Sequence, residues 1–498
     1  MQFASVYFML FLSVAVVGYF LLPGQRSRTI WLLAASYVFY YSLSASWTVV
    51  LVAVTAIGFG FGLLLERLRP TVPGGPMPRR LRLVLSAGIV LAVGTLVVFK
   101  YAGFIGVLAD DLLRAFGSNA STPVLALALP VGISFWTFQT IAYLVDVARG
   151  RLQAERSPVR YALFVSFFPH VTAGPIARGG QLLPQFAERR RFSFEGMRSG
   201  LLLLGWGFLK KLLIADSLSV FVAVVFGNPQ AFGDSSLVLA AASVAFALQI
   251  YFDFAGYTDI ARGTARLFGV DLMRNFDRPY AARSIKEFWR RWHMTLMAWL
   301  RDYVYIPLGG SRVPKARRYA NILVVFAISG LWHGAGLTFL FWGLLNGAYQ
   351  ILGEVLAPLR DRLTAVLHIP REGRLRHAIQ TVTTFVLVTI GWVFFRAESL
   401  ADAFFIISRM FVPTFGSEGA AALARLGLSY PALALAGLAA IAVLVVEWVA
   451  SRVDLPARLC RAPLVVRWVA YQSLILAVVV FGQYGPGVTA TDFVYFRF

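Results

Sequence analysis

The stretch NILVVFAISGLWHGAGLTFLFWGLLNGAYQIL, residues 321–352, decides how this chain folds, because it is almost wholly apolar and longer than one membrane span. With its flanking residues, 319–353, it would measure about 52 Å as a single helix rising 1.5 Å per residue, against roughly 30 Å of hydrocarbon in a bilayer. We therefore expect it to tilt strongly, to break, or to form two elements. The glycines Gly330, Gly334 and Gly336 favour a break beside His333.

His333 is the one residue of this stretch that titrates near neutral pH. A Lys, Arg or Asp at bilayer depth costs roughly 2.5–3.5 kcal/mol on insertion scales, so ionisable residues within spans mark functional sites by default. Its surroundings, GLWHGAG, supply Trp332 as a wall and glycines that let a substrate or another backbone approach closely. A neutral imidazole can accept a proton near pH 7. From the residues alone, a proton-transfer group and a histidine kept for packing fit equally well.

The composition indicates an integral membrane protein. Of 498 residues, 58% are hydrophobic and 14% are charged, whereas a soluble chain has about 25% charged residues. The N-terminal run to Gly24 has no basic start and no A-x-A cleavage site, so we interpret it as a first span and not as a removed signal peptide. The single cysteine, Cys460, excludes an internal disulfide, and no Cys/His zinc spacing occurs, so no metal site is expected.

The net charge of +22 comes mostly from short basic loops between apolar runs, as the positive-inside rule predicts. This distribution explains the basic residues without a nucleic-acid partner, and we expect none. Five basic clusters are candidate cytoplasmic segments: Arg67–Arg82, Arg189–Arg198, Arg283–Arg291, Arg312–Arg318 and Arg360–Arg376.

Eleven apolar runs of spanning length predict an all-α polytopic protein that forms one domain over residues 1–498. The runs are 5–22, 29–45, 46–65, 82–105, 122–145, 198–226, 236–260, 320–350, 377–395, 432–450 and 468–485. Lys210 and Lys211 interrupt one of these runs. The glycines of GFGFG, Gly58–Gly62, lie within another, where helix packing is their expected use.

Two segments differ from ordinary spans. Residues 157–176 run into FFPHVTAGPIARGG and are too short and too rich in Pro and Gly for a simple span, so we expect a re-entrant or interfacial segment. Residues 281–308 mix aromatic and basic residues and predict one amphipathic helix lying at the cytoplasmic interface. Four side chains share its apolar face at spacings of three and four: Trp289, Trp292, Leu296 and Trp299.

Several further ionisable residues are candidates for chemistry or for pairing. His293, beside two arginines in RRWHMT, is either an interfacial histidine or one that orients a substrate. Asp259 and Arg262 are three residues apart and can pair on one helical face. Asp253 lies deeper among aromatic residues and needs a partner from another element.

The other three histidines are not expected to take part in the chemistry. His170, in a Pro/Gly-rich turn, is expected to be an interfacial or capping residue. His368 and His377 lie in a basic loop and are expected to be solvated.

Seven stretches, in this order along the chain, resemble the membrane-bound O-acyltransferase family and its bacterial alginate O-acetylation branch in particular. They are LPVGISFWTFQTIAYLVDVARG (129–150), FFPHVTAGPIAR (167–178), LQIYFDFAGYTDIARG (248–263), NFDRPYAARSIKEFWRRWHMTLMAWLRDYVYIPLGG (275–310), GLWHGAGLTFLFWGLLNG (330–347), GWVFFRA (391–397) and FVYFRF (493–498). The resemblance implies N-terminal spans in 1–128 and a motif-bearing core in 129–498. One departure is His170, where relatives usually carry Gln.

The resemblance implies a fold of about eleven transmembrane helices with re-entrant and interfacial helices around a central pore. It also implies that His333 is the catalytic histidine and that His293 is a second, less uniformly essential one. Further residues that would line or shape the same cavity are Trp332, Asn275, Trp292, Arg301, Asp302, Asp253, Arg290 and Arg291.

The function that follows from the resemblance is acyl transfer across the bacterial inner membrane. The acyl group, most simply acetyl, would come from a cytoplasmic thioester such as acetyl-CoA, and no tightly bound cofactor is expected. Basic residues such as Arg290, Arg291 and Lys286 could attract the phosphorylated carrier, and His333 would remove the acceptor's hydroxyl proton. The group would reach an extracytoplasmic polysaccharide such as alginate, directly or through a periplasmic acetyltransferase partner.

Two other classes of protein fit part of the pattern. A polysaccharide or lipid-linked transporter or flippase would explain the spans and the buried polar residues, but not the coincidence of two histidine motifs. A structural scaffold for an export complex would make His333 dispensable. Acetyl release from acetyl-CoA separates the enzyme from both.

Overall fold

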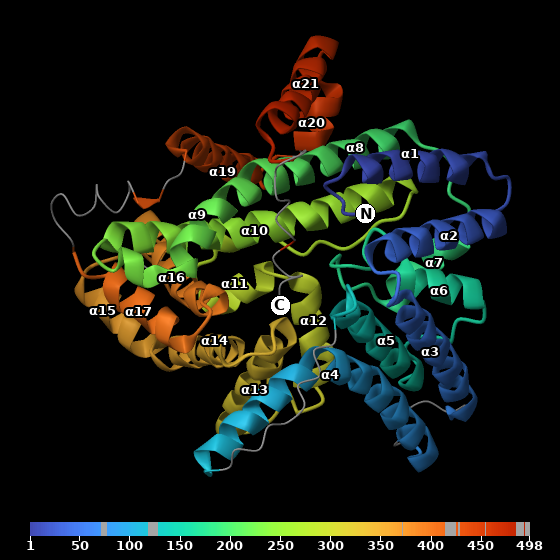
Figure 1. Ribbon diagram of the computed structural model, residues 1–498, viewed down its shortest axis with the longest axis horizontal. Helices are drawn as coiled ribbons and strands as arrows, with labels where there is room; N and C mark the ends of the chain where they lie inside the picture. Colours follow the sequence, from blue (N-terminus) through green and yellow to red (C-terminus); the bar gives the residue numbers. More distant parts are fainter. Residues whose placement is uncertain are drawn as a thin grey trace. The chain divides into compact units, whose positions relative to one another are not determined.

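The computed structural model describes residues 1–70, 77–117, 128–370, 372–413, 425–426, 429–453, 455–484 and 493. Every regular element in this part of the chain is helical, so the predicted all-α fold is confirmed (Figure 1). Six helices are long and apolar enough to cross a membrane: α3 (Thr48–Leu68), α4 (Arg79–Ala115), α10 (Ser236–Leu267), α16 (Arg374–Arg396), α19 (Tyr430–Ala450) and α21 (Leu464–Phe481). The apolar helix α1 (Val6–Leu21) is shorter.

The count of about eleven spans stays a prediction. Length and composition identify six candidates among the described residues, and the predicted run 122–145 begins outside them. The predicted run 29–45 falls in α2 (Gln25–Leu43). The predicted run 198–226 is divided among α8 (Phe194–Phe208), a π-helix, η1 (Leu209–Ala215), and α9 (Asp216–Gly227).

The chain divides into two compact units, Met1–Leu204 with Ile260–Met273, and Gly205–Asp259 with Arg274–Phe498. The prediction of one polytopic domain stays a prediction. In the first unit nearly every residue of α5 (Ile133–Ala148) is buried, because α3 and α4 both pack against it. A Cβ added to Gly62 would lie 2.6 Å from the Tyr143 ring, and one added to Gly58 3.0 Å from Thr140. The expected packing role is therefore confirmed for Gly58 and Gly62, whereas a Cβ added to Gly60 would have no other atom of the described residues within 4 Å.

The Pro/Gly-rich region of the first unit forms a short helix and a buried turn. Helix α6 (Pro158–Ser166) is capped by the Ser157 hydroxyl and ends before FFPHVTAGPIA, almost all of which is buried. Helix α7 (Gly179–Ala187) follows. This part of the chain is irregular and enclosed in protein, and its re-entrant or interfacial placement stays a prediction.

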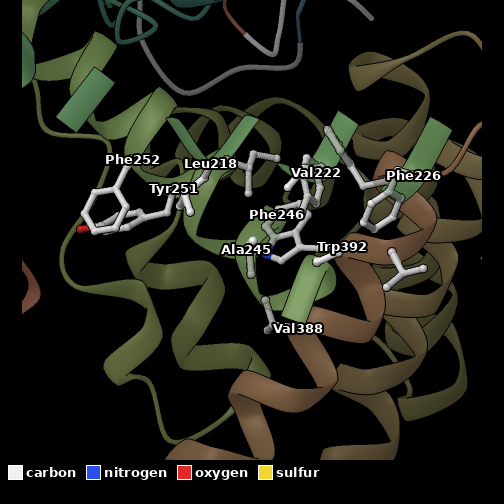
Figure 2. Packing of buried hydrophobic residues seen from close by; sticks show 14 of the residues in the cluster. Leu218, Val222, Phe226, Ala245, Phe246, Tyr251, Phe252, Val388 and Trp392 are labelled. Carbon is white, nitrogen blue, oxygen red and sulfur yellow. The ribbon is translucent and has the colours of Figure 1, made fainter. Parts of the chain in front are cut away.

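The second unit has an extensive core in which helices far apart in sequence meet. Figure 2 shows Leu218, Val222 and Phe226 of α9 with Phe246 of α10 and Trp392 of α16. The other described helices of this unit, beyond those named above and those that carry the site below, are α15 (Ala357–Val366), α17 (Leu400–Met410), α20 (Leu455–Arg461) and two short 3-10 helices, η2 (Pro229–Phe232) and η3 (Pro279–Ala281).

The long apolar stretch breaks at the expected place. Helix α13 (Lys315–His333) ends at the histidine, and α14 (Leu337–Val355) returns along it (Figure 1). A Cβ on Gly330 would lie 2.2 Å from the Phe339 carbonyl oxygen, and one on Gly343 would lie 2.3 Å from the Phe326 carbonyl oxygen. The two backbones can approach this closely only because both positions are glycine, and the crossing fixes the end of α13.

The expected single amphipathic helix over 281–308 is wrong. The chain forms α11 (Ile285–Arg291), α12 (Met294–Leu300) and a π-helix, η4 (Arg301–Tyr305), with a break at Trp292 and His293. The apolar face packs into the core of the second unit, since all four of its side chains are buried: Trp289, Trp292, Leu296 and Trp299. Helical spacing reports one apolar face, and it cannot distinguish a face turned to lipid from one turned to other helices.

Candidate active site of the second unit

His333 is held at the end of α13 by aromatic rings from three helices. Its side chain is only 3% exposed. The ring centroids of Trp332, Trp342 of α14 and Phe395 of α16 lie 4.8, 5.1 and 5.3 Å from the imidazole centroid. The C-terminal end of a helix carries partial negative charge, which favours the positive charge that a base acquires when it accepts a proton.

His293 reaches the same place from a segment 40 residues earlier. Its side chain is fully buried, and its imidazole centroid lies 6.5 Å from that of His333 and 5.7 Å from Trp332. Phe254 of α10 packs edge-on against it at 4.7 Å. Burial lowers the pKa of His293 to about 3, so this imidazole is neutral at physiological pH. The interfacial interpretation of His293 is therefore wrong, because the residue is enclosed by protein.

The two imidazoles lie close enough for one small group to reach both. The wall continues through Trp292, which packs 4.9 Å from Trp392, and through Trp342, which stacks on Trp392 at 5.6 Å. A large, rigid aromatic lining excludes water and strengthens electrostatic interactions within it. The sequence predicted Trp292 and Trp332 as cavity residues, and the structure brings both beside the histidines.

His293 has a left-handed backbone conformation, with φ of 43° and ψ of 54°. This conformation costs about 1–2 kcal/mol for a residue other than glycine. Buried Asn275 lies against the next turn, where its side-chain oxygen accepts a 2.6 Å hydrogen bond from the Thr295 hydroxyl. The Asn275 carbonyl accepts a further bond, of 2.9 Å, from the Met294 N–H. The sequence predicted Asn275 as a cavity residue. In the structure Asn275 binds Met294 and Thr295, the two residues that follow His293.

Asp253 finds the partner from another element that its position required. Lys211 of η1 lies 2.7 Å from Asp253 and 2.8 Å from Asp216, with all three side chains at least 90% buried. The expectation for Asp253 is confirmed. Asp253 therefore belongs to a group of paired, buried charges.

Lys210, the residue before Lys211, forms a second group of buried ion pairs. Its ammonium lies 2.9 Å from Asp259 of α10 and 2.7 Å from Glu447 of α19, and the Tyr251 hydroxyl donates a 2.7 Å bond to Glu447. Within its own unit Asp259 therefore pairs with Lys210, and the pairing with Arg262 stays a prediction. The signal for this network was the pair of lysines inside an apolar run. Their spacing did not show that a π-helix turns both towards acidic partners.

The predicted arginines lie towards the surface. Arg301 is 63% exposed and binds its neighbour Asp302, which is largely buried, at 2.7 Å. Arg291 pairs with Glu287 at 2.6 Å, and Arg290 is exposed on the same short helix. The structure does not bring Arg301 into the aromatic lining of the histidines, and the roles of these residues towards a substrate stay predictions.

The remaining three histidines differ in how far they are exposed. His170, in the first unit, is 2% exposed, so an interfacial position is wrong, and burial lowers its pKa to about 4. His368 is exposed, as expected. His377 is half-buried and lies 3.1 Å from an Arg283 nitrogen. Among the residues that the structure describes, no three His, Cys, Asp or Glu side chains gather as metal ligands would.

Comparison with known proteins identifies the class of chemistry. Residues 117–396 match the membrane-bound O-acyltransferase family, which is more than half of the chain. A "probable alginate O-acetylase" of Pseudomonas aeruginosa is 37% identical over 428 residues, covering 86% of this chain and 77% of its own. A peptidoglycan O-acetyltransferase of Helicobacter pylori is 34% identical over 431 residues, covering 80% and 77%. A teichoic acid D-alanyltransferase of Bacillus subtilis is 28% identical over 225 residues, covering 43% and 56%.

The matched region includes α5 to α16, and so both histidines and the helices that enclose them. The family and the named activities of the relatives agree with the acyl-transfer expectation drawn from the motifs. This chain belongs to the membrane-bound O-acyltransferase family and is an O-acyltransferase of the membrane.

Proposed function

We propose that this protein moves an acetyl group from a cytoplasmic thioester, such as acetyl-CoA, towards an extracytoplasmic polysaccharide, with His333 as the general base. The observation that carries the proposal is the meeting of His333 and His293, with ring centroids 6.5 Å apart, inside a buried aromatic lining. A general base must reach the proton that it removes, and in a dry site this contributes about 10²–10⁴-fold to the rate.

The reaction follows from these positions. His333 accepts the proton of the acceptor hydroxyl while that oxygen attacks the thioester carbonyl carbon. The new C–O bond forms, the C–S bond of the tetrahedral intermediate breaks, and the departing thiolate takes the proton that His333 holds. His293, neutral because burial lowers its pKa to about 3, orients the substrate through its imidazole. Holding both reactants within about 3–3.5 Å supplies much of the acceleration.

The donor enters from the cytoplasmic side in this proposal. Exposed Arg290 and Lys286 on α11 supply positive charge close in sequence to His293, and such charge attracts a phosphorylated carrier. The location in a bacterial inner membrane is supported by the bacterial relatives and by the six candidate spans.

The acceptor is proposed to be an exopolysaccharide such as alginate. The named activities of relatives at 34–37% identity support O-acetyl transfer to an extracytoplasmic glycan. The group could pass to a periplasmic acetyltransferase partner before it reaches the polymer.

The test replaces His333 by Ala and by Gln in cells and measures the O-acetyl content of the secreted polysaccharide, normalised to the protein in the membrane. We expect acetylation to fall by at least 100-fold, with an intermediate loss for His293→Ala. His368→Ala is the matched control, because His368 is exposed whereas both histidines of the pair are buried. Unchanged acetylation in both His333 variants would refute the base assignment. Purified protein should release acetyl from acetyl-CoA, and failure to do so with and without acceptor would exclude this donor.

A further inference from the structure

Helix α12 begins without a cap of its own. His293 occupies the N-cap position, where Ser, Thr, Asp or Asn usually accepts a bond from the first turn, and its side chain makes no such bond. Instead the imidazole packs against Phe254, Trp332 and His333. The first turn of α12 therefore needs an acceptor from elsewhere in the chain.

Asn275, 20 residues before Thr295, supplies that acceptor. Its side-chain oxygen lies 3.4 Å from the Thr295 N–H and 2.6 Å from the Thr295 hydroxyl. A backbone N–H can only donate, so the atom that faces it must be the amide oxygen and not the amide nitrogen. The Asn275 carbonyl accepts from the Met294 N–H at 2.9 Å. The two residues that follow His293 are thus both bound to one asparagine.

Helix α10 anchors this asparagine and also packs against the histidine. The Asn275 side-chain nitrogen donates a 3.4 Å bond to the hydroxyl of Thr258, and both residues are buried. Phe254, four residues before Thr258 on the same face of α10, contacts the His293 ring at 4.7 Å. Helix α10 therefore contacts the His293 ring through Phe254 and binds the Asn275 side chain through Thr258. A second backbone bond, from Asp277 N–H to the Arg291 carbonyl at 3.0 Å, closes the loop before the histidine.

We infer that Asn275 and Thr295 are positioning residues, which cap α12 in place of His293 and hold His293 in its left-handed conformation so that its ring meets His333. The inference rests on the proposed function, since it assigns a purpose to the orientation of His293. Catalytic side chains must be positioned to within a fraction of an ångström, and such precision needs supporting hydrogen bonds. Loss of one supporting bond displaces the catalytic side chain without removing it.

The sharpest test changes the Thr295 hydroxyl alone. Thr295→Val keeps the shape and removes the donor to Asn275, whereas Thr295→Ser keeps the donor. We expect Thr295→Val to lower the kcat of acetyl transfer roughly tenfold with KM little changed, and Thr295→Ser to restore most of the rate. Rates are normalised to folded protein recovered after size-exclusion chromatography, so that a loss of folding cannot imitate a loss of positioning.

A double-mutant cycle separates positioning from general stabilisation. If Thr295 acts through His293, Thr295→Val should cost nothing further in a His293→Ala background. An equal loss in both backgrounds would overturn the inference, and so would full activity of Thr295→Val when His293→Ala is impaired. Full activity of His293→Ala would instead remove the proposed role of His293 itself, and the inference would fall with it. The parent protein, the two single variants and the double variant therefore distinguish failure of the Thr295 inference from failure of the role proposed for His293.

Discussion

Replacing Lys211 by Met should destabilise the second unit more than any surface change does. Methionine keeps the length of the side chain and removes its charge, which leaves Asp253 and Asp216 without the ammonium that lies 2.7 and 2.8 Å from them. Both carboxylates are at least 92% buried, so water cannot replace the lost partner. Removing one member of a buried ion pair typically costs about 3–5 kcal/mol.

The assay is thermal stability in detergent, read as the fraction of monodisperse protein that survives heating. At about 2 °C per kcal/mol for a chain larger than 150–250 residues, the expected shift is roughly 6–10 °C downwards. Lys286→Met is the matched control, because it makes the same chemical change on the exposed face of α11. That variant should stay within about 1 °C of the parent protein, since isolated surface charges contribute little.

The cause is checked by a second substitution. Adding Asp253→Asn to Lys211→Met removes one of the two stranded charges and should recover part of the lost stability, with a coupling energy of about 1–3 kcal/mol. The reasoning is refuted if Lys211→Met has the same melting temperature as the parent protein, or if the double variant is no more stable than Lys211→Met.

Two further predictions concern the helix crossing and the pH dependence. Gly330→Ala should cost about 1–3 kcal/mol or prevent folding, because its Cβ would lie 2.2 Å from the Phe339 carbonyl oxygen. Gly353→Ala, with open space around it on α14, should be neutral or stabilising, and equal yields of the two variants would contradict this packing. Burial lowers the pKa of His293 to about 3, so it gains no proton between pH 5 and 8. An acid limb in the rate of acetyl release above pH 5 should therefore persist in His293→Gln, and its disappearance in that variant would show that His293 titrates there.

The sequence alone predicted the elements whose signal is local. Apolar length indicated spans, and the glycines beside His333 predicted the break between α13 and α14, which the structure has at Gly334–Gly336. The ordered motifs predicted the family. Each of these depends on residues close together in the chain, where hydropathy and backbone freedom are readable without knowing what packs against them.

The tertiary structure decided which buried group meets which. Helical spacing placed Trp292 and His293 on a membrane-surface helix, but the core of the second unit encloses both, because a left-handed turn at His293 divides that helix. A buried ion pair joins Asp259 to Lys210, 49 residues earlier, and the sequence around Asp259 did not indicate this partner.

A buried charge takes whichever opposite charge the fold brings within about 3 Å, and sequence separation does not enter that free energy. The sequence by itself determined that a histidine lies inside a long apolar stretch whose glycines favour a break. Only the folded unit placed a second histidine beside it, with an asparagine to hold that histidine there.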